Sequence, residues 1–177
     1  KLITSFDAKP GDALVLVTNM DGRWLEKSNY WNCTLPRHDA NLVGNLELLP
    51  EAAEAGLTCA GKDVSMAGIA GTLVMLAECS GVGAYIDTDS VPVPGGYDRE
   101  VWLEPFLRAF FSYGFLLSAR EKKLPELVRP FLARGLYAAR IGGFRDGSQV
   151  MLQQGGRSAL LQDWGKQPFI GFGERRS

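Results

Sequence analysis

The chain has 177 residues, of which 46% are hydrophobic and 22% are charged, and its formal net charge is −1. This length suits one globular domain that buries a proper core. The nearly balanced charge argues against nucleic-acid binding through bulk electrostatics, and no apolar stretch is long enough for a membrane span.

Cysteine usage and the first residue add two expectations. Cys33, Cys59 and Cys79 are widely spaced and form no CxxC pair. Neither a zinc site nor a disulfide scaffold is indicated, and a reducing, cytoplasmic setting is expected. The sequence begins with Lys1 rather than Met, which we interpret as a piece of a longer protein.

The first third of the chain is predicted to contain a strand and a helical segment. ALVLVTN (residues 13–19) follows a turn and has no helical period, which predicts a buried strand. Residues 24–36 are aromatic and irregular, and receive no assignment. Residues 45–56 have apolar positions at helical spacing with Gly56 as C-cap, but Pro50 in the interior favours two short helices.

The remaining elements alternate between helices and strands. They are a loop at residues 62–67, helices at 68–80, 99–110 and 124–135, and strands at 84–88, 113–119, 136–144 and 148–154. Arg145-Asp146-Gly147 separates the last two strands and predicts a β-hairpin. The pattern predicts one domain over residues 1–177, an α/β (α+β) sandwich with helices packed on a mixed sheet.

The segment Asp63-Val64-Ser65-Met66-Ala67-Gly68 combines three groups that can bind anions or metals. Free backbone N–H groups at a helix start, here Ala67 and Gly68, can bind phosphate oxygens. Ser65 can donate a hydrogen bond to the same phosphate, and Asp63 can hold a magnesium ion that bridges phosphates. The alternative is that Ser65 or Asp63 caps the following helix, and the spacing alone favours this structural interpretation.

A longer pattern carries a family resemblance. DVSMAGIAGTLVMLAECSGVGAYIDTDSVPVP (residues 63–94) resembles the D-[VI]-S-D-G-L … E-A-S-G-V-G-A-x-[IL]-D-x-x-x-[IL]-P stretch of the aminoimidazole ribonucleotide (AIR) synthetase family. That family includes thiamine-monophosphate kinase, selenophosphate synthetase and a hydrogenase maturation factor. Further landmarks at residues 11–19, 110–119 and 138–152 follow the family's order. The chain resembles the C-terminal domain of an AIR synthase-related protein.

The resemblance implies a division of labour between two domains. In the family, the N-terminal domain supplies dimer contacts and most aspartates for magnesium and ATP, and the C-terminal domain closes over the nucleotide. Asp63 matches a magnesium ligand and Ser65 an ATP contact. Met66 stands where relatives keep a second aspartate. Ser112-Tyr113-Gly114 replaces part of G-G-E-D-Y, which argues against thiamine monophosphate as the substrate.

The expected parent protein transfers a phosphoryl group from Mg-ATP to a small substrate. Asn19, Asp21 and Arg23 follow the first strand and are expected to line the substrate side. The partner is an upstream ATP-binding domain; a homodimer is left open, and neither nucleic acid nor membrane is expected. Without the ATP-binding half, the domain is expected to be inactive.

Two alternatives remain open beside the active parent. One is a degenerate, non-catalytic module that keeps a nucleotide- or metabolite-binding pocket, for which Met66 and the Ser112-Tyr113-Gly114 segment are the evidence. The other is a scaffold or interaction domain that binds no ligand.

Overall fold

The structure of the chain, a computed structural model, describes residues 1–25, 28–34 and 40–171. Its main sheet consists of β1 (Asp12–Thr18), β4 (Ala60–Asp63), β5 (Gly83–Asp87), β7 (Gly114–Arg120), β8 (Tyr137–Arg145), β9 (Gln149–Gln154) and β10 (Arg157–Asp163). The strand order is β10-β9-β5-β8-β1-β7-β4. β5 and β9 pair in parallel and all other neighbours pair antiparallel, so the sheet is mixed.

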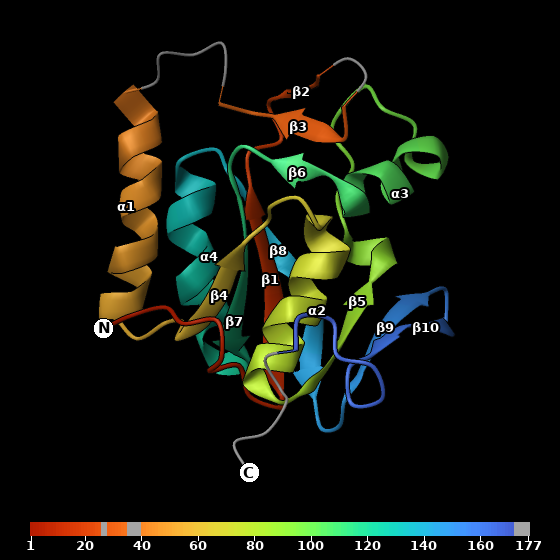
Figure 1. Cartoon of the computed structure of the whole chain (residues 1–177). Helices are drawn as coiled ribbons and strands as arrows, with labels where there is room; N and C mark the ends of the chain where they lie inside the picture. Colours follow the sequence, from red (N-terminus) through yellow and green to blue (C-terminus); the bar gives the residue numbers. More distant parts are fainter. Residues whose placement is uncertain (26–27, 35–39, 172–177) are drawn as a thin grey trace.

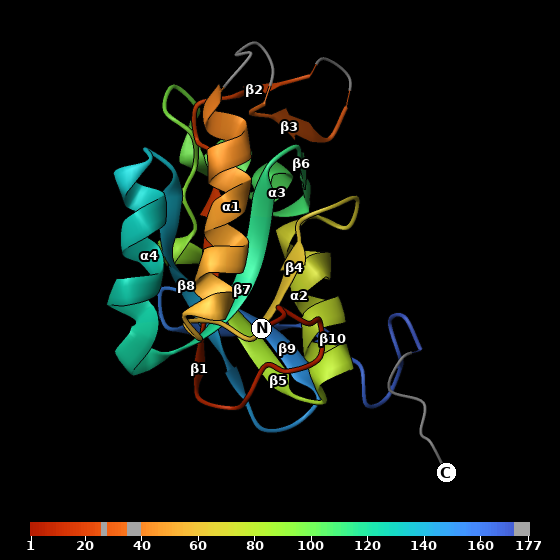
Figure 2. The same ribbon diagram turned by 90° about the vertical axis from the view of Figure 1, so that its left-hand side faces the viewer.

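Helices cover both faces of this sheet. The described helices are α1 (Ala40–Glu54), α2 (Gly68–Ser80), α3 (Arg99–Arg108) and α4 (Leu124–Ala133), with short 3₁₀ turns η1 (Thr88–Ser90) and η2 (Glu121–Lys123). α1 and α4 lie side by side on one face, and α2 lies on the other (Figure 2). None of the helices in the described ranges has the length and apolar character needed to cross a bilayer. The predicted class, helices packed on a mixed sheet, is confirmed.

β1 is the centre of the sheet. All seven of its residues are buried, and it pairs with β7 along one edge and β8 along the other. A strand that is covered on both faces has apolar side chains in succession rather than in alternation. This is why ALVLVT has no polar face, and the strand predicted from it is confirmed with its start at Asp12.

A second, small sheet lies beyond one end of the main sheet (Figure 1). It consists of β2 (Arg23–Trp24), β3 (Tyr30–Asn32) and β6 (Phe110–Phe111), in the order β2-β3-β6. Aromatic contacts hold it against α3: Trp24 stacks on Trp102 with ring centroids 5.3 Å apart, and Trp31 is fully buried. The unassigned aromatic segment thus contributes two strands, and its residues 26–27 and 35–36 lie outside the described ranges.

The prediction of two short helices around Pro50 is wrong. α1 is one helix of 15 residues with Pro50 inside it. Pro50 is exposed and removes a single backbone hydrogen bond, whereas Leu48 and Ala52 are buried in the core and keep both halves in place. The chain does turn at Gly56, whose φ of 67° is left-handed as expected for the residue after a helix.

The prediction of a hairpin between β8 and β9 is also wrong, because β5 lies between them. The connection from β8 to β9 passes close to the start of β5. A Cβ on Gly83 would lie 3.0 Å from the carbonyl oxygens of Asp146 and Gln149. The observed hairpin joins β9 to β10 through Gly155 and Gly156, and β10 is an element that the sequence did not predict.

The loop predicted at residues 62–67 begins inside β4. Asp63 is the last residue of that strand and pairs with Phe115 of β7. β7 itself begins at Gly114, one residue later than predicted. Asp63 is therefore held at the end of a strand instead of on a free loop.

Gly142 is a position where the pairing of β8 depends on the absence of a side chain. It lies where the register of β1 and β8 shifts, and a Cβ there would overlap the carbonyl oxygen of Tyr85 on β5. We expect Gly142→Ala to lower the free energy of unfolding by about 3 kcal/mol, because β5 and β8 must move apart to make room for the methyl group. Urea unfolding measures this change. In the control Gly95→Ala, where a Cβ meets nothing within 4 Å, a comparable loss would contradict the explanation.

Candidate functional site

A cleft of about 320 Å³ lies where β4 ends and β7 begins. It is walled mainly by apolar and aromatic side chains, with a few polar groups among them, as is common for small-molecule sites. Its lining residues are Thr34, Leu42, Leu46, Asp63, Val64, Phe110, Phe111, Ser112, Tyr113, Gly114 and Phe115. The cleft thus brings together two segments that the sequence singled out, Asp63 and Ser112-Tyr113-Gly114, which are about fifty residues apart.

Backbone hydrogen bonds fix the position of Asp63. The Val64 N–H donates to the Gly114 carbonyl at 2.9 Å, and the Phe111 N–H donates to the Val64 carbonyl at 3.3 Å. The Asp63 side chain is 60% exposed and pairs with the Lys62 ammonium at 3.2 Å. An exposed pair of this kind is weak, so the Asp63 carboxylate is free to exchange this partner for a ligand.

The segment Ser112-Tyr113 is locked into the protein by its polar groups. The Ser112 hydroxyl accepts a hydrogen bond from the Cys33 N–H at 2.9 Å, and the Tyr113 hydroxyl donates to the Asn45 carbonyl at 2.9 Å. Thr18, at the end of β1, donates its hydroxyl to the Tyr113 carbonyl at 2.8 Å. The segment therefore forms a rigid wall of the cleft.

Burial keeps the two titratable groups of this wall protonated. Desolvation raises the pKa of Tyr113 to about 12; negative charge on the nearby Cys33 adds to the shift, and Arg134 opposes it. Burial likewise raises the pKa of the Cys33 thiol, against the opposing effect of its contact with Ser112. A thiol with a raised pKa is a poor nucleophile. The wall has a structural role, and neither group is suited to attack a substrate.

The turn before α2 carries the predicted phosphate contacts. The N-cap of α2 is Ala67, and no side chain caps the helix, so the interpretation of Ser65 or Asp63 as a cap is wrong. The Ser65 carbonyl instead accepts the Gly68 N–H at 2.9 Å. Among the described residues, neither the Ser65 hydroxyl nor the Ala67 N–H has a hydrogen-bond partner. Both are available as donors to an anion.

Gly68 has a structural reason to be glycine. Its φ is +66°, and a Cβ there would lie 2.5 Å from the Cα and carbonyl carbon of Arg108. The buried start of α2 is thereby packed directly against the end of α3. The Gly68 N–H already donates to the Ser65 carbonyl. Gly68 therefore contributes to the site by shaping the turn that presents Ser65 and Ala67.

Asp63 fits a partial magnesium site. Met66 is 84% exposed and offers only a thioether, and the described part of the chain contains no group of three or more metal-ligating side chains. Magnesium is commonly held by one or two carboxylates together with phosphate oxygens and water. One exposed carboxylate is therefore compatible with an ion whose other ligands come from a nucleotide and a second domain.

The three predicted substrate residues are only partly associated with the cleft. Asn19 donates its side-chain N–H to the Cys33 carbonyl at 3.3 Å and accepts the Asp21 N–H at 2.9 Å. It shapes the turn after β1 and does not line the cleft; Cys33 links it to Ser112, which does. Asp21 and Arg23 are exposed, and neither lines the cleft.

The aromatic walls of the cleft were not predicted from the sequence. Phe110, Phe111 and Phe115 line it, but in the sequence they read as parts of a helix end and a buried strand. The signal that could have found them is the resemblance of residues 110–119 to a motif of the family.

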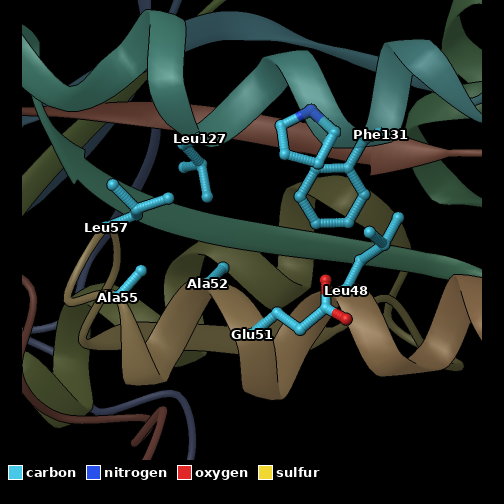
Figure 3. Close-up of a pocket in the computed structure, with 8 residues that line it drawn as sticks. Leu48, Glu51, Ala52, Ala55, Leu57, Leu127 and Phe131 are labelled. Atoms are coloured by element: carbon cyan, nitrogen blue, oxygen red, sulfur yellow. The ribbon is translucent and has the colours of Figure 1, made fainter.

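A second, smaller pocket of about 170 Å³ lies between α1 and α4 (Figure 3). It is apolar apart from the Glu51 carboxylate, and it is lined by Leu48, Glu51, Ala52, Ala55, Leu57, Leu127, Pro130 and Phe131. It contains none of the predicted site residues. We regard it as a packing gap between the two helices.

Comparison with known proteins identifies the family. Residues 9–153 match the family described as "AIR synthase related protein, C-terminal domain", and the chain belongs to it. An uncharacterised protein of the cyanobacterium Synechocystis is 41% identical over 172 residues, covering 97% of this chain and 52% of that protein. An uncharacterised protein of Methanocaldococcus jannaschii is 28% identical over 127 residues, covering 71% and 38%. The chain spans about half the length of the first relative and less of the second.

Solved structures share the fold. PurL of Thermotoga maritima complexed with ATP superposes with a TM-score of 0.69 at 15% identity, covering 89% of this chain and 26% of that one. The hydrogenase maturation protein HypE in complex with ATP gives 0.64 at 18% identity, covering 91% and 53%. The family resemblance and the expected fold are confirmed, and at these identities the likeness concerns the fold alone.

Tyr113 allows a test of the rigid wall. The folded state binds the Tyr113 proton more tightly than the unfolded state does. Its contribution to the free energy of unfolding is therefore fully present below pH 10 and is lost as the pH rises toward 12. We expect Tyr113 to contribute about 2 kcal/mol to the loss of stability between these pH values. Tyr113→Phe should remove that part and leave the smaller loss that follows from the raised pKa values of Cys33 and Tyr137. Urea unfolding at both ends of this range measures it. The half-buried Tyr30, stacked on Phe110, provides the control; if Tyr30→Phe removes the same loss, the assignment to Tyr113 fails.

Proposed function

We propose that this domain is the C-terminal half of an ATP-dependent enzyme that transfers a phosphoryl group to a small acceptor. One observation carries the proposal. Asp63, which matches a metal ligand of the family, and Ser112-Tyr113-Gly114, which occupies the place of its substrate-contacting motif, line the same cleft. The ATP complexes of PurL and HypE, which share this fold, are consistent with it.

Each residue of the proposed site has one task. Asp63 at the rim of the cleft supplies one oxygen ligand to the magnesium ion. The Ser65 hydroxyl and the Ala67 N–H donate to phosphate oxygens, and Gly68 permits the turn that presents them. When bound, Mg-ATP supplies the phosphoryl group and neutralises charge that develops on it.

The acceptor is proposed to occupy the cleft beside Asp63. The aromatic walls formed by Phe110, Phe111 and Phe115 exclude water and hold an apolar body by burial. Asn19 supports Cys33, which in turn donates its N–H to Ser112 of the cleft, whereas Asp21 and Arg23 are proposed to contact the exposed end of a larger acceptor.

The second half of the proposed active site lies in an upstream ATP-binding domain. Asp63 is a single ligand, and magnesium requires more; the remaining carboxylates are assigned to that domain, as the family resemblance implies. The 177-residue domain alone is therefore proposed to have no ATPase activity. A measurable ATPase activity of the isolated domain that depends on Asp63 would overturn this division.

Asp63→Asn tests the metal role in the full-length protein. Removing the charge while keeping the shape is expected to weaken magnesium-dependent ATP binding by about tenfold, the loss of one charge-assisted contact. Isothermal titration with ATP, with and without magnesium, measures the effect. The matched control is Asp146→Asn, because Asp146 is an exposed residue in the β8–β9 connection. Equal weakening by both variants, or none by Asp63→Asn, would contradict the assignment.

The rival proposal is a degenerate module that binds a nucleotide or metabolite without turnover. The exposed Met66 in the place of a family aspartate favours it. Phosphate release from Mg-ATP, measured for the full-length wild-type protein and for its Met66→Asp variant, distinguishes the degenerate module from the enzyme. Activity that appears only in Met66→Asp supports the degenerate module, and activity without the substitution supports the enzyme.

A further inference from the structure

α2 is apolar on all sides. Its sequence, GIAGTLVMLAECS, contains Glu78 as its one charged residue. A helix without a polar face must be covered on its outer side as well as where it packs on a sheet. Gly71, Val74, Met75 and Glu78 have the spacing i, i+3, i+4, i+7 and therefore share one side of the helix.

The C-terminal segment after β10 provides a cover on this side. The Trp164 indole N–H donates to the Val82 carbonyl at 3.1 Å and anchors the segment just beyond the end of α2. The chain then turns back across α2 (Figure 1). The Phe169 ring reaches Gly71, where a Cβ would lie 3.7 Å from the ring edge. Gly71 is one turn from the start of the helix.

Glu78 holds the far end of this segment. One oxygen of its carboxylate, Oε2, accepts the N–H groups of both Phe169 and Ile170, at 2.8 Å and 3.1 Å. Between Trp164 and these two amides, the segment is exposed. Lys166 and Gln167 are tied back to the end of β10, because their N–H groups donate to the Asp163 carbonyl at 3.1 Å and 3.0 Å. Beyond Gln167, the hydrogen bonds within the described residues all go to the single Glu78 oxygen.

The attachment at Glu78 is costly. The residue is 2% exposed, and within the described ranges its other oxygen, Oε1, has no hydrogen-bond partner and its carboxylate has no cationic partner. Glu78 is also in the last turn of α2, where the helix dipole disfavours a negative charge. Opening the segment would hydrate this carboxylate and recover part of the free energy of its burial.

We infer that residues 168–171 form a detachable strap, for which Glu78 is the latch and the turn at residues 163–167 is the hinge. The strap opens locally while the sheet stays folded, as weakly attached segments of native proteins do. Opening uncovers the side of α2 at Gly71, one helical turn from the Ser65–Gly68 turn. The strap lies beyond residue 153, where the family match ends. Similarity to the Synechocystis protein covers 97% of the chain and so extends past that point.

Amide hydrogen exchange tests the strap without any ligand. In the wild-type chain, the Phe169 and Ile170 amides are expected to be protected but to exchange faster than those of β1. In Glu78→Ala they are expected to exchange about tenfold faster or more, the effect of losing one charge-assisted acceptor. β1 amides should stay unchanged. Cleavage by trypsin after Lys166, whose side chain is 82% exposed, should accelerate in parallel.

Two further variants keep the result unambiguous. Phe169→Ala leaves α2 intact and should also accelerate exchange at Ile170, because it removes the contact with Gly71. Glu47→Ala, at an exposed glutamate of α1, should change neither amide. The inference fails if Glu78→Ala leaves the Phe169 and Ile170 amides as protected as before. It also fails if the β1 amides accelerate together with them, because the segment would then open only with the whole domain.

Discussion

The burial of β1 is the constraint on which the rest of the structure depends. Because the strand is covered on both faces, its backbone groups must find partners along both edges, and β7 and β8 supply them. Its two polar residues lie at its ends. Asp12 accepts the Ser118 hydroxyl at 2.6 Å, and Thr18 donates to the Tyr113 carbonyl. The bond from Thr18 fixes Tyr113, which lines the cleft. The candidate site is therefore positioned by the end of the central strand.

Local patterns predicted the elements whose signal lies within one segment. The uninterrupted apolar run of β1 and the glycine-bounded apolar run of α2 were both recognised from the sequence alone. The position of β5 was not, because its partners β8 and β9 lie more than fifty residues later. An Asp-Gly turn between two strands is compatible with a hairpin. It is equally compatible with a connection between strands that have a third strand between them in the sheet, as β5 lies between β8 and β9.

The residues of the candidate site that lie in one continuous motif were predictable from the sequence. Those that come together only when distant strands pair were not. Asp63 and Ser65 follow from one short stretch of sequence. Asp63 and Ser112 line the same cleft only because β4 pairs with β7. No local sequence pattern specifies this pairing. Gly68 was expected to contact phosphate, and its positive φ and its approach to Arg108 add a structural role that the sequence did not indicate. The contact of Phe169 with Gly71 likewise joins segments a hundred residues apart.

The place of β5 between β8 and β9 has a consequence for biosynthesis. A chain emerging from the ribosome has completed β1 and β5 long before residues 137–154, which pair with them, become available. Until then, two apolar strands have unpaired edges, a state that is prone to aggregation and slow to resolve. The sheet can therefore be completed only late, after Gln154 is released.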